Sequence, residues 1–233
     1  MRLLGTKTTL AAFRWDLIYL SAQLVSDERP GVSDLAPPVQ ALLAQTDAEH
    51  AAYQQTEDAV IVAGALVDKK DSRRDKILVA AGGVTRATEA EVYKTLFPRL
   101  NPSLTARLGI DAESTEVDRI LGELAKLPAD SALRISYEKP LTEAEALLKV
   151  ASKQSDQAAT SFALQRSQLE RFKLTLDQQR LVTHGSLLVL LKSKTEADAF
   201  FRATSTPPGE PAVKDTQASA TPQAPSASPA NIG

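Results

Sequence analysis

Every seventh residue from Leu141 onward is apolar except Ser155 and Thr183, within a stretch to Phe201 that contains no proline, and a second series follows three residues after the first. Together the two series form one stripe with a mean spacing of about 3.5 residues, which is typical of a helix packed lengthwise on other helices. We therefore predict a helix over about 141–203. The first series is Leu141, Leu148, Ser155, Phe162, Leu169, Leu176, Thr183, Leu190 and Ala197, and the second is Ala144, Ala151, Ala158, Gln165, Phe172, Gln179, Ser186, Ser193 and Phe200.

The start of this helix is marked by a capping box, in which the hydroxyl of Thr142 and the carboxylate of Glu145 satisfy each other's backbone N–H groups. Pro140, which is unfavourable inside a helix, lies just upstream. An unbroken helix of this length would be roughly 90 Å long at about 1.5 Å per residue. We therefore expect a kink, and the glycine at position 185 is its predicted place.

The first half of the chain predicts a medium helix over about 8–26, a proline-bearing linker over 27–38, and a long helix over about 38–81. The pair Gly82-Gly83 is the predicted end of the long helix. The apolar stripe of the long helix is interrupted by a charged belt at 68–76 but resumes in phase. A turn at Asp71-Ser72 that starts a new helix is the alternative.

The region between the two long helices predicts shorter elements. A capping box at Thr88 to Glu91 opens a short helix that Pro98 stops, and Asn101 with Pro102 caps another turn or two. A medium amphipathic helix covers 114–127. Residues 133–137 alternate like a strand, but one strand without a partner is improbable. From about residue 204 the composition is rich in Pro, Ala, Ser and Thr, which predicts a disordered tail over 204–233.

A weak internal repeat aligns the two halves. A shift of about 107 positions superimposes the medium helices, and both long helices carry Asp-x-x-Arg, at Asp71 to Arg74 and at Asp177 to Arg180. If the repeat is real, two helical hairpins form an up-down-up-down bundle in which the long helices are parallel. The fold class is thus all-α: an elongated antiparallel helical bundle built on two long helices, about 38–81 and 141–203, plus two medium helices.

Composition narrows the class of protein further. With 233 residues, 43% of them hydrophobic, the chain can bury one core, so we expect a single bundle domain over 1–203. A formal net charge of -2 argues against a nucleic-acid partner. Cysteine is absent, which excludes disulfides and thiolate sites. No signal peptide or stretch long enough for a membrane span is evident, so we expect a soluble, cytoplasmic protein.

Candidate metal ligands are few. Asp47, Glu49 and His50 lie on the first long helix and His184 on the second. Di-metal bundles need carboxylates from several helices and two Glu-x-x-His motifs, and position 181, where the second acid would stand, is a leucine. We therefore expect no metal, no cofactor and no catalytic residues, and we interpret His50 as a hydrogen-bonded core histidine.

The charged belt from Asp68 to Lys76 is the strongest polar feature. The carboxylates of Asp68, Asp71 and Asp75 are spaced to share one helix face. They could hold a cation or a partner's basic patch. The simpler interpretation is a solvated face with ion pairs to residues of the other long helix such as Arg171 or Arg180, each pair contributing little.

The segment from Leu187 to Leu191 is apolar all round, so it lies either at the bundle centre or in an oligomer contact. Our hypothesis is a non-catalytic helical bundle with a structural or scaffold role that acts through protein–protein contacts. We expect it to self-associate as a homo-oligomer along this apolar segment. The alternative is a membrane- or lipid-interacting bundle that exposes Ala59 to Val67 and Leu187 to Leu191. The candidate interaction surface consists of Leu187, Leu188, Val189, Leu190, Leu191, Asp68, Asp71 and Asp75.

Overall fold

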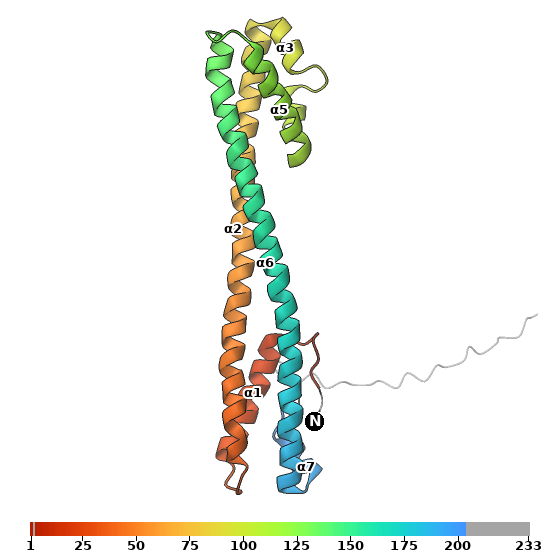
Figure 1. The fold of residues 1–233 in the computed structure, drawn as a ribbon. Coiled ribbons are helices and arrows are strands. Elements are labelled where there is room, and N and C mark those ends of the chain that lie inside the picture. Colours follow the sequence, from red (N-terminus) through yellow and green to blue (C-terminus); the bar gives the residue numbers. More distant parts are fainter. Residues whose placement is uncertain (2, 204–233) are drawn as a thin grey trace, which may run out of the picture.

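Two long helices, α2 (Ala36–Thr88) and α6 (Ala132–Leu191), pair along their lengths and form a rod (Figure 1). The computed structural model describes residue 1 and residues 3–203. The pairing is antiparallel, because the ring of Tyr53 lies 5.3 Å from that of Phe162 while Arg74, further along α2, contacts the earlier Glu145. The all-α, elongated class is confirmed. The parallel arrangement of the long helices that the internal repeat would imply is therefore wrong. The predicted tail lies outside the described residues.

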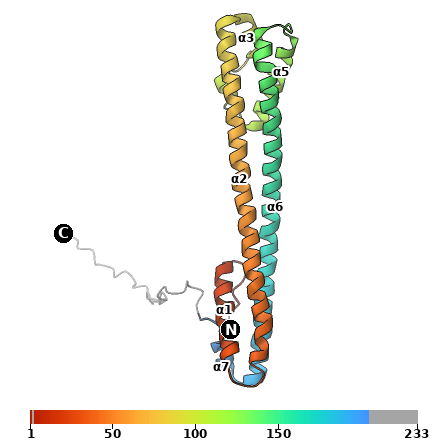
Figure 2. The ribbon, with the colours of Figure 1, turned by 90° about the vertical axis from the view of Figure 1, so that its left-hand side faces the viewer.

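The shorter helices gather at the two ends of the rod (Figure 2). At one end α1 (Leu10–Ser26) packs on the long helices, together with the 3₁₀ turn η1 (Ser33–Leu35) and α7 (Lys194–Ala199). At the other end lie α3 (Ala90–Leu96), α4 (Pro102–Thr105) and α5 (Ile110–Lys126). Between these ends, α2 and α6 run side by side with no other described helix against them, and we call this middle part the waist.

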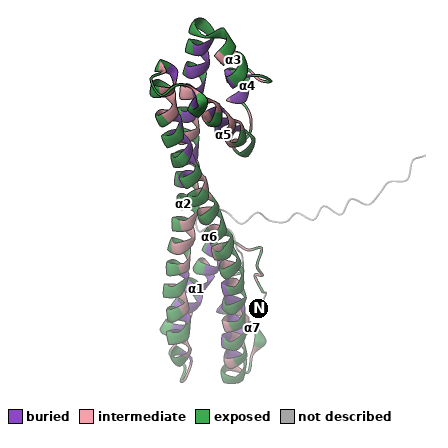
Figure 3. Cartoon of the chain, turned by 45° about the horizontal axis from the view of Figure 1, so that its top comes forward, coloured by how far each residue is buried: buried purple, intermediate pink, exposed green. Residues whose placement is uncertain are grey.

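Each end has a core of its own, and buried residues are concentrated there (Figure 3). A small buried cluster of Val67, Leu148 and Ala151, against which Ile110 of α5 packs, lies where the waist meets the α5 end. The core at the α1 end contains Leu10, Phe13, Leu17, Leu20, Leu24, Val32, Ala36, Val39, Phe172, Leu176, Leu187, Ala197, Phe200 and Phe201, and the core at the α5 end contains Leu78, Leu96, Phe97, Val117, Ile120, Leu124 and Leu141.

The heptad stripe on α6 is confirmed as the seam of the rod. All its positions from Leu141 to Ser186 are buried or half-buried, and Leu190 is the exception within the helix. Alanines at 144 and 151 are fully covered, as expected where two helices approach closely.

The predicted start of α6 is wrong. The helix begins at Ala132 and runs through Pro140. The hydroxyl of Thr142 donates to the carbonyl of Glu138 at 2.7 Å, so Thr142 is an interior residue and not a cap. Leu133 and Leu141, spaced two turns apart, are both buried, and this packing at the α5 end outweighs the hydrogen bond that the proline lacks.

The predicted end of α6 is also wrong, because the helix stops at Leu191 and not near residue 203. Lys192 takes the left-handed conformation with φ 55°, and its N–H donates to the carbonyl of Leu188 at 3.0 Å. The chain then reverses into α7, and Phe200 and Phe201, which follow α7, are buried in the core. Gly185, the predicted kink, lies inside the continuous helix.

Helix α2 continues through both of its predicted breaks. No turn occurs at Asp71-Ser72, and the helix passes Gly82-Gly83 to end at Thr88. Gly82 serves packing instead, because a Cβ there would lie 2.0 Å from Cγ of Pro102. The capping box at Thr88 is therefore wrong, since Thr88 is still helical.

Two predictions for the region between the long helices hold in substance. The side chain of Asn101 accepts a hydrogen bond from the N–H of Leu104 at 2.9 Å, which confirms the cap of α4. The predicted helix over 114–127 is α5, which begins four residues earlier at Ile110. Residues 133–137 are helical, in agreement with the judgement against a strand.

Candidate functional site

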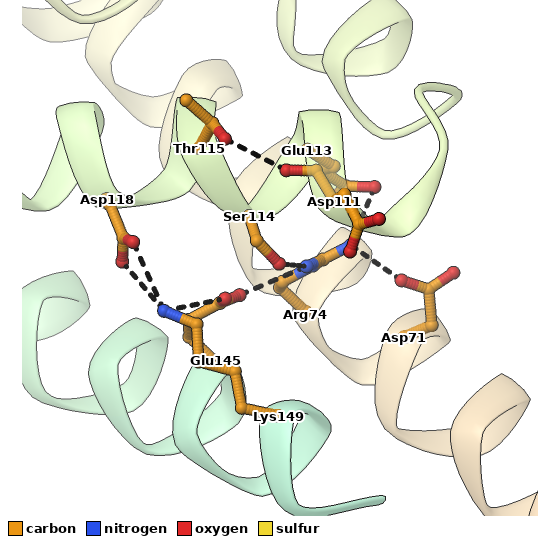
Figure 4. Close-up of polar contacts among 9 residues, drawn as sticks. All are labelled: Asp71, Arg74, Asp111, Glu113, Ser114, Thr115, Asp118, Glu145 and Lys149. Carbon is orange, nitrogen blue, oxygen red and sulfur yellow. Dashed lines mark hydrogen bonds and ion pairs between the residues drawn. The ribbon is translucent and has the colours of Figure 1, made fainter. Parts of the chain in front are cut away.

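A fully buried arginine, Arg74 of α2, joins three helices at the α5 end (Figure 4). Its Nη2 lies 2.7 Å from Oδ1 of Asp71 and 2.8 Å from Oε2 of Glu113. Its Nη1 donates to Oε2 of Glu145 and to Oγ of Ser114, both at 3.0 Å. One guanidinium thus contacts carboxylates from α2, α5 and α6.

Further charged groups surround this arginine. Nζ of Lys149 lies 3.3 Å from Oε1 of Glu145 and 3.1 Å from Oδ2 of Asp118 (Figure 4). On α2, Asp75 brings one oxygen within 4.8 Å of an oxygen of Asp71 and of Glu113. Acids therefore outnumber bases around Arg74.

Burial and neighbouring charges shift the pKa values of these acids. Burial, together with a hydrogen bond shared with Asp75, raises the pKa of Glu113 to about 8 against the opposing effect of Arg74. Burial and then the charge of Asp75 raise the pKa of Asp71. Burial works to raise the pKa of Glu145 as well, but hydrogen bonds from Ser114 and Arg74 hold it below its usual value.

A second buried arginine, Arg180 of α6, occupies the matching place at the α1 end. Its Nε donates to Oδ2 of Asp16 at 2.6 Å and its Nη1 to Oδ1 of Asp177 at 2.7 Å. The two carboxylates also accept backbone hydrogen bonds: Asp177 from the N–H of Gly5 at 2.7 Å, and Asp16 from the N–H of Arg202 at 3.2 Å. These contacts hold three parts of the chain against α6: helix α1, the segment before α1 and the segment after α7.

The acidic line predicted on α2 is divided by the fold. Asp68 is exposed, whereas Asp71 and Asp75 are half-buried and belong to the Arg74 cluster. The expected partner of these acids was an arginine of α6, but Arg180 binds acids at the other end of the rod. The Asp-x-x-Arg repeat was the available signal for both buried arginines, and Glu113 carried no signal of its own.

The histidines do not form a site together. His50 is exposed, so its interpretation as a core residue is wrong. Asp47 pairs with Arg14 through a contact of 2.6 Å. His184 lies at the α1 end, where its Nε2 is 2.7 Å from Oδ1 of Asp198.

The predicted apolar segment at the end of α6 is divided between core and surface. Leu187 is fully buried and Leu191 half-buried, whereas Leu188, Val189 and Leu190 are exposed. The side chain of Leu190 lies next to Gly31: its Cδ2 is 3.4 Å from the position that a Cβ on Gly31 would take.

The exposed part of this segment extends a longer stripe along the outside of α6. Leu174, Leu181 and Leu188 are spaced seven residues apart and are 57%, 43% and 36% exposed. Val182 and Val189, next to the last two leucines, are 51% and 75% exposed. Each leucine precedes a seam position by two residues and so lies about 200° around the helix from it. We call these five residues the outer stripe.

The surroundings of the outer stripe are unusually free of charge. From Leu181 to Leu191, α6 contains no Asp, Glu, Lys or Arg. Gly185 is exposed within this segment, and nothing lies within 4 Å of a Cβ placed on it. A second helix could therefore approach α6 closely at this point.

A smaller apolar surface lies on the waist. Val67 is buried in the seam, but Ile61 and Val62 are 65% and 59% exposed and Leu66 is also exposed. On α6, Val150 is 55% exposed and follows Leu148, which packs in the cluster with Val67. Within the described residues no helix combines the length and the apolar character that crossing a bilayer requires.

Comparison with known proteins found no matching family model, no matching curated protein and no matching solved structure. The chain is thus defined by its own architecture, an antiparallel two-helix rod with a small helical core and a buried arginine cluster at each end.

Proposed function

We propose that the protein is a non-catalytic helical rod that acts through protein–protein contacts and that its first partner is a second copy of itself. The observation that carries this proposal is the outer stripe of α6. Its three leucines recur every seven residues, and Val182 and Val189 stand beside the last two, so the five apolar side chains lie along one side of the helix. The inner seam of α6 is already filled by α2, whereas the outer stripe is open to solvent.

The polarity of the segment supports a protein partner. A helix face in contact with water normally carries charged residues, and the described surface of α6 between Leu181 and Leu191 has none apart from the partly buried His184. The exposed apolar side chains are neighbours on one face, and contiguous apolar patches of this kind mark interaction sites more often than scattered ones do.

The stripe is suited to a symmetric dimer. If two copies pack antiparallel about an axis near Leu181, Leu174 of one copy lies opposite Leu188 of the other, and the same patch serves both chains. Gly185 then lies beside the axis and allows the backbones to approach. The pairing would extend the helix–helix packing of the rod across two molecules.

Light scattering coupled to size exclusion tests this proposal on the full chain. We expect a mass of twice 25.0 kDa at micromolar concentration. Leu181→Glu should give a single chain, because the two introduced carboxylates would face each other across the interface.

Leu164→Glu is the matched control, since Leu164 is a 60% exposed leucine of the same helix that lies off the outer stripe. This variant should remain dimeric. A wild-type monomer at the highest concentrations tested, or a loss of the dimer in Leu164→Glu as well, would reject the outer stripe as the contact.

The exposed valine and isoleucine of the waist favour a second candidate function, contact with a lipid surface. Ile61 and Val62 project from the part of the rod that no third helix covers. Flotation with neutral and anionic vesicles tests it: the full chain should float and Ile61→Gln with Val62→Gln should not. Failure of the wild type to float with either vesicle removes this candidate.

A further inference from the structure

We propose that Asp71, Asp75 and Glu113 form a binding site for one hard divalent cation at the α5 end of the rod. One oxygen from each of the three carboxylates can be chosen so that all lie within 4.8 Å of one another. Carboxylate oxygens at such separations can share one ion, because Ca²⁺ binds its oxygen ligands at about 2.3–2.6 Å. The proposal concerns the opposite end of the rod from the outer stripe and does not depend on self-association.

Unpartnered oxygens in this cluster point to a ligand. The side chain of Glu113 is 1% exposed, and its Oε1 accepts no hydrogen bond from any described residue. Oδ1 of Asp75 is buried and accepts no hydrogen bond from an N–H or hydroxyl group; Glu113 and Asp75 share a hydrogen bond only when one of them carries a proton, which a bound cation would replace. Buried carboxylate oxygens without donors are costly, and a bound cation would satisfy both.

The charges of the cluster also leave room for a divalent ion. The carboxyl groups of Asp71, Asp75, Glu113 and Glu145 surround Arg74, and Lys149 lies between Glu145 and Asp118 at the edge. Five carboxyl groups thus face two bases. The field of this cluster favours a further positive charge, which a Ca²⁺ or Mg²⁺ ion would supply.

Arg74 does not occupy the proposed position. Its Nη2 makes ion pairs with Oδ1 of Asp71 and with Oε2 of Glu113, and neither oxygen of Glu113 accepts a hydrogen bond from a described residue, so Oε1 lacks both kinds of contact with Arg74. The guanidinium therefore orients two of the acids while a cation binds their remaining oxygens. Asp71 keeps 30% of its side chain exposed, which gives an ion access from solvent.

The cluster at the other end shows what a closed arrangement looks like. Arg180 has two carboxylate partners, Asp16 and Asp177, and both accept backbone hydrogen bonds in addition. None of their oxygens is among the buried atoms of residues 1 and 3–203 that lack a hydrogen bond. The same Asp-x-x-Arg motif is thus satisfied at the α1 end and left with unpartnered acid oxygens at the α5 end.

The full chain is first treated with a chelator and dialysed. Isothermal titration calorimetry with CaCl₂, and separately with MgCl₂, then tests the site. We expect one ion per chain with a dissociation constant below about 1 mM, the weak end of protein Ca²⁺ sites. Glu113→Gln should weaken binding at least tenfold. Asp68→Asn is the matched control, because it removes an exposed acid one turn from Asp71 and should leave binding unchanged.

Asp75→Asn provides an independent variant in case Glu113→Gln fails to fold, which circular dichroism of the metal-free protein would reveal. The wild type should also melt at a higher temperature in CaCl₂ than in chelator, and Asp75→Asn should not. Absence of binding below about 1 mM, or equal binding by wild type and Asp75→Asn, would overturn the proposal. If the acids hold a shared proton and no cation, the titration will show no binding below about 1 mM.

Discussion

Replacing Arg74 by methionine tests the role of the buried cluster in holding the α5 end together. Methionine keeps the length and the apolar stem of the side chain but removes the charge. The guanidinium is fully buried and makes three ion pairs, at 2.7, 2.8 and 3.0 Å, with acids from three helices. Loss of one partner from a buried ion pair destabilises a protein by about 3–5 kcal/mol, because the remaining charges lie uncompensated in the interior.

We therefore expect Arg74→Met to lower the free energy of unfolding at pH 7.5 by about 3–5 kcal/mol. The deficit should shrink toward pH 5, because acids that have lost their cation take up protons in the folded state and the folded variant is then relatively more stable. Urea titrations followed by circular dichroism at both pH values measure this, since the single tryptophan, Trp15, lies at the other end of the rod.

Arg73→Met is the matched control, because Arg73 is exposed on the same helix and its loss should change stability by less than about 0.5 kcal/mol. A deficit of less than about 1 kcal/mol for Arg74→Met, or one equal to that of the control, would show that the cluster does not stabilise the rod as argued.

Three further changes test particular contacts. The pKa of Glu113 is about 8 in the fold against 4.5 ordinarily, so the metal-free wild type should lose stability as the pH rises from about 5 to about 8, and Glu113→Gln should not, as pH-dependent urea titrations would show. Gly82→Ala should lower the melting temperature because its Cβ would clash with Pro102, whereas Gly83→Ala, with open space around its Cβ, should raise it slightly. Pro140→Ala should stabilise the chain by about 1–3 kcal/mol in urea titrations, because it restores a hydrogen-bond donor inside α6; no gain would mean that the helix starts at the proline.

The rod itself could be predicted from the sequence because its packing is periodic. A helix that contacts one neighbour along its whole length repeats the same environment every seven residues, and the series through Leu148 and Phe172 records that repeat. The sequence pattern does not indicate whether the partner helix runs parallel or antiparallel. Parallel and antiparallel neighbours select the same apolar spacing, and the antiparallel arrangement emerged only from contacts such as Tyr53 with Phe162.

The helix ends were predicted less well because tertiary packing overrides local signals. The sequence around Thr142 and Glu145 has the form of a cap, but burial of Leu133 draws the preceding residues into the helix. The carboxylate of Glu145 then forms an ion pair with Arg74 and does not cap a helix. A capping motif is a local preference, and it loses to a core contact available a few residues upstream.

The candidate sites were partly visible in the sequence. The segment Leu187 to Leu191 was identified as apolar, but the outer stripe also includes Leu174 and Leu181, which belong to the face opposite the seam. That division requires knowing which face α2 covers. Glu113 could not be identified, because its burial depends on where α5 docks on the long helices and no local pattern encodes this position.

The central claim, self-association through the outer stripe, is tested most directly by cross-linking, which the absence of cysteine makes clean. In an antiparallel dimer about Leu181, a cysteine at this position lies close to its own copy, within the roughly 4.4–6.8 Å between Cα atoms that a disulfide spans. Mild oxidation of Leu181→Cys should give a covalent dimer on a non-reducing gel, while Leu164→Cys should stay monomeric. Failure of Leu181→Cys to cross-link, or equal cross-linking of the two variants, would contradict the account.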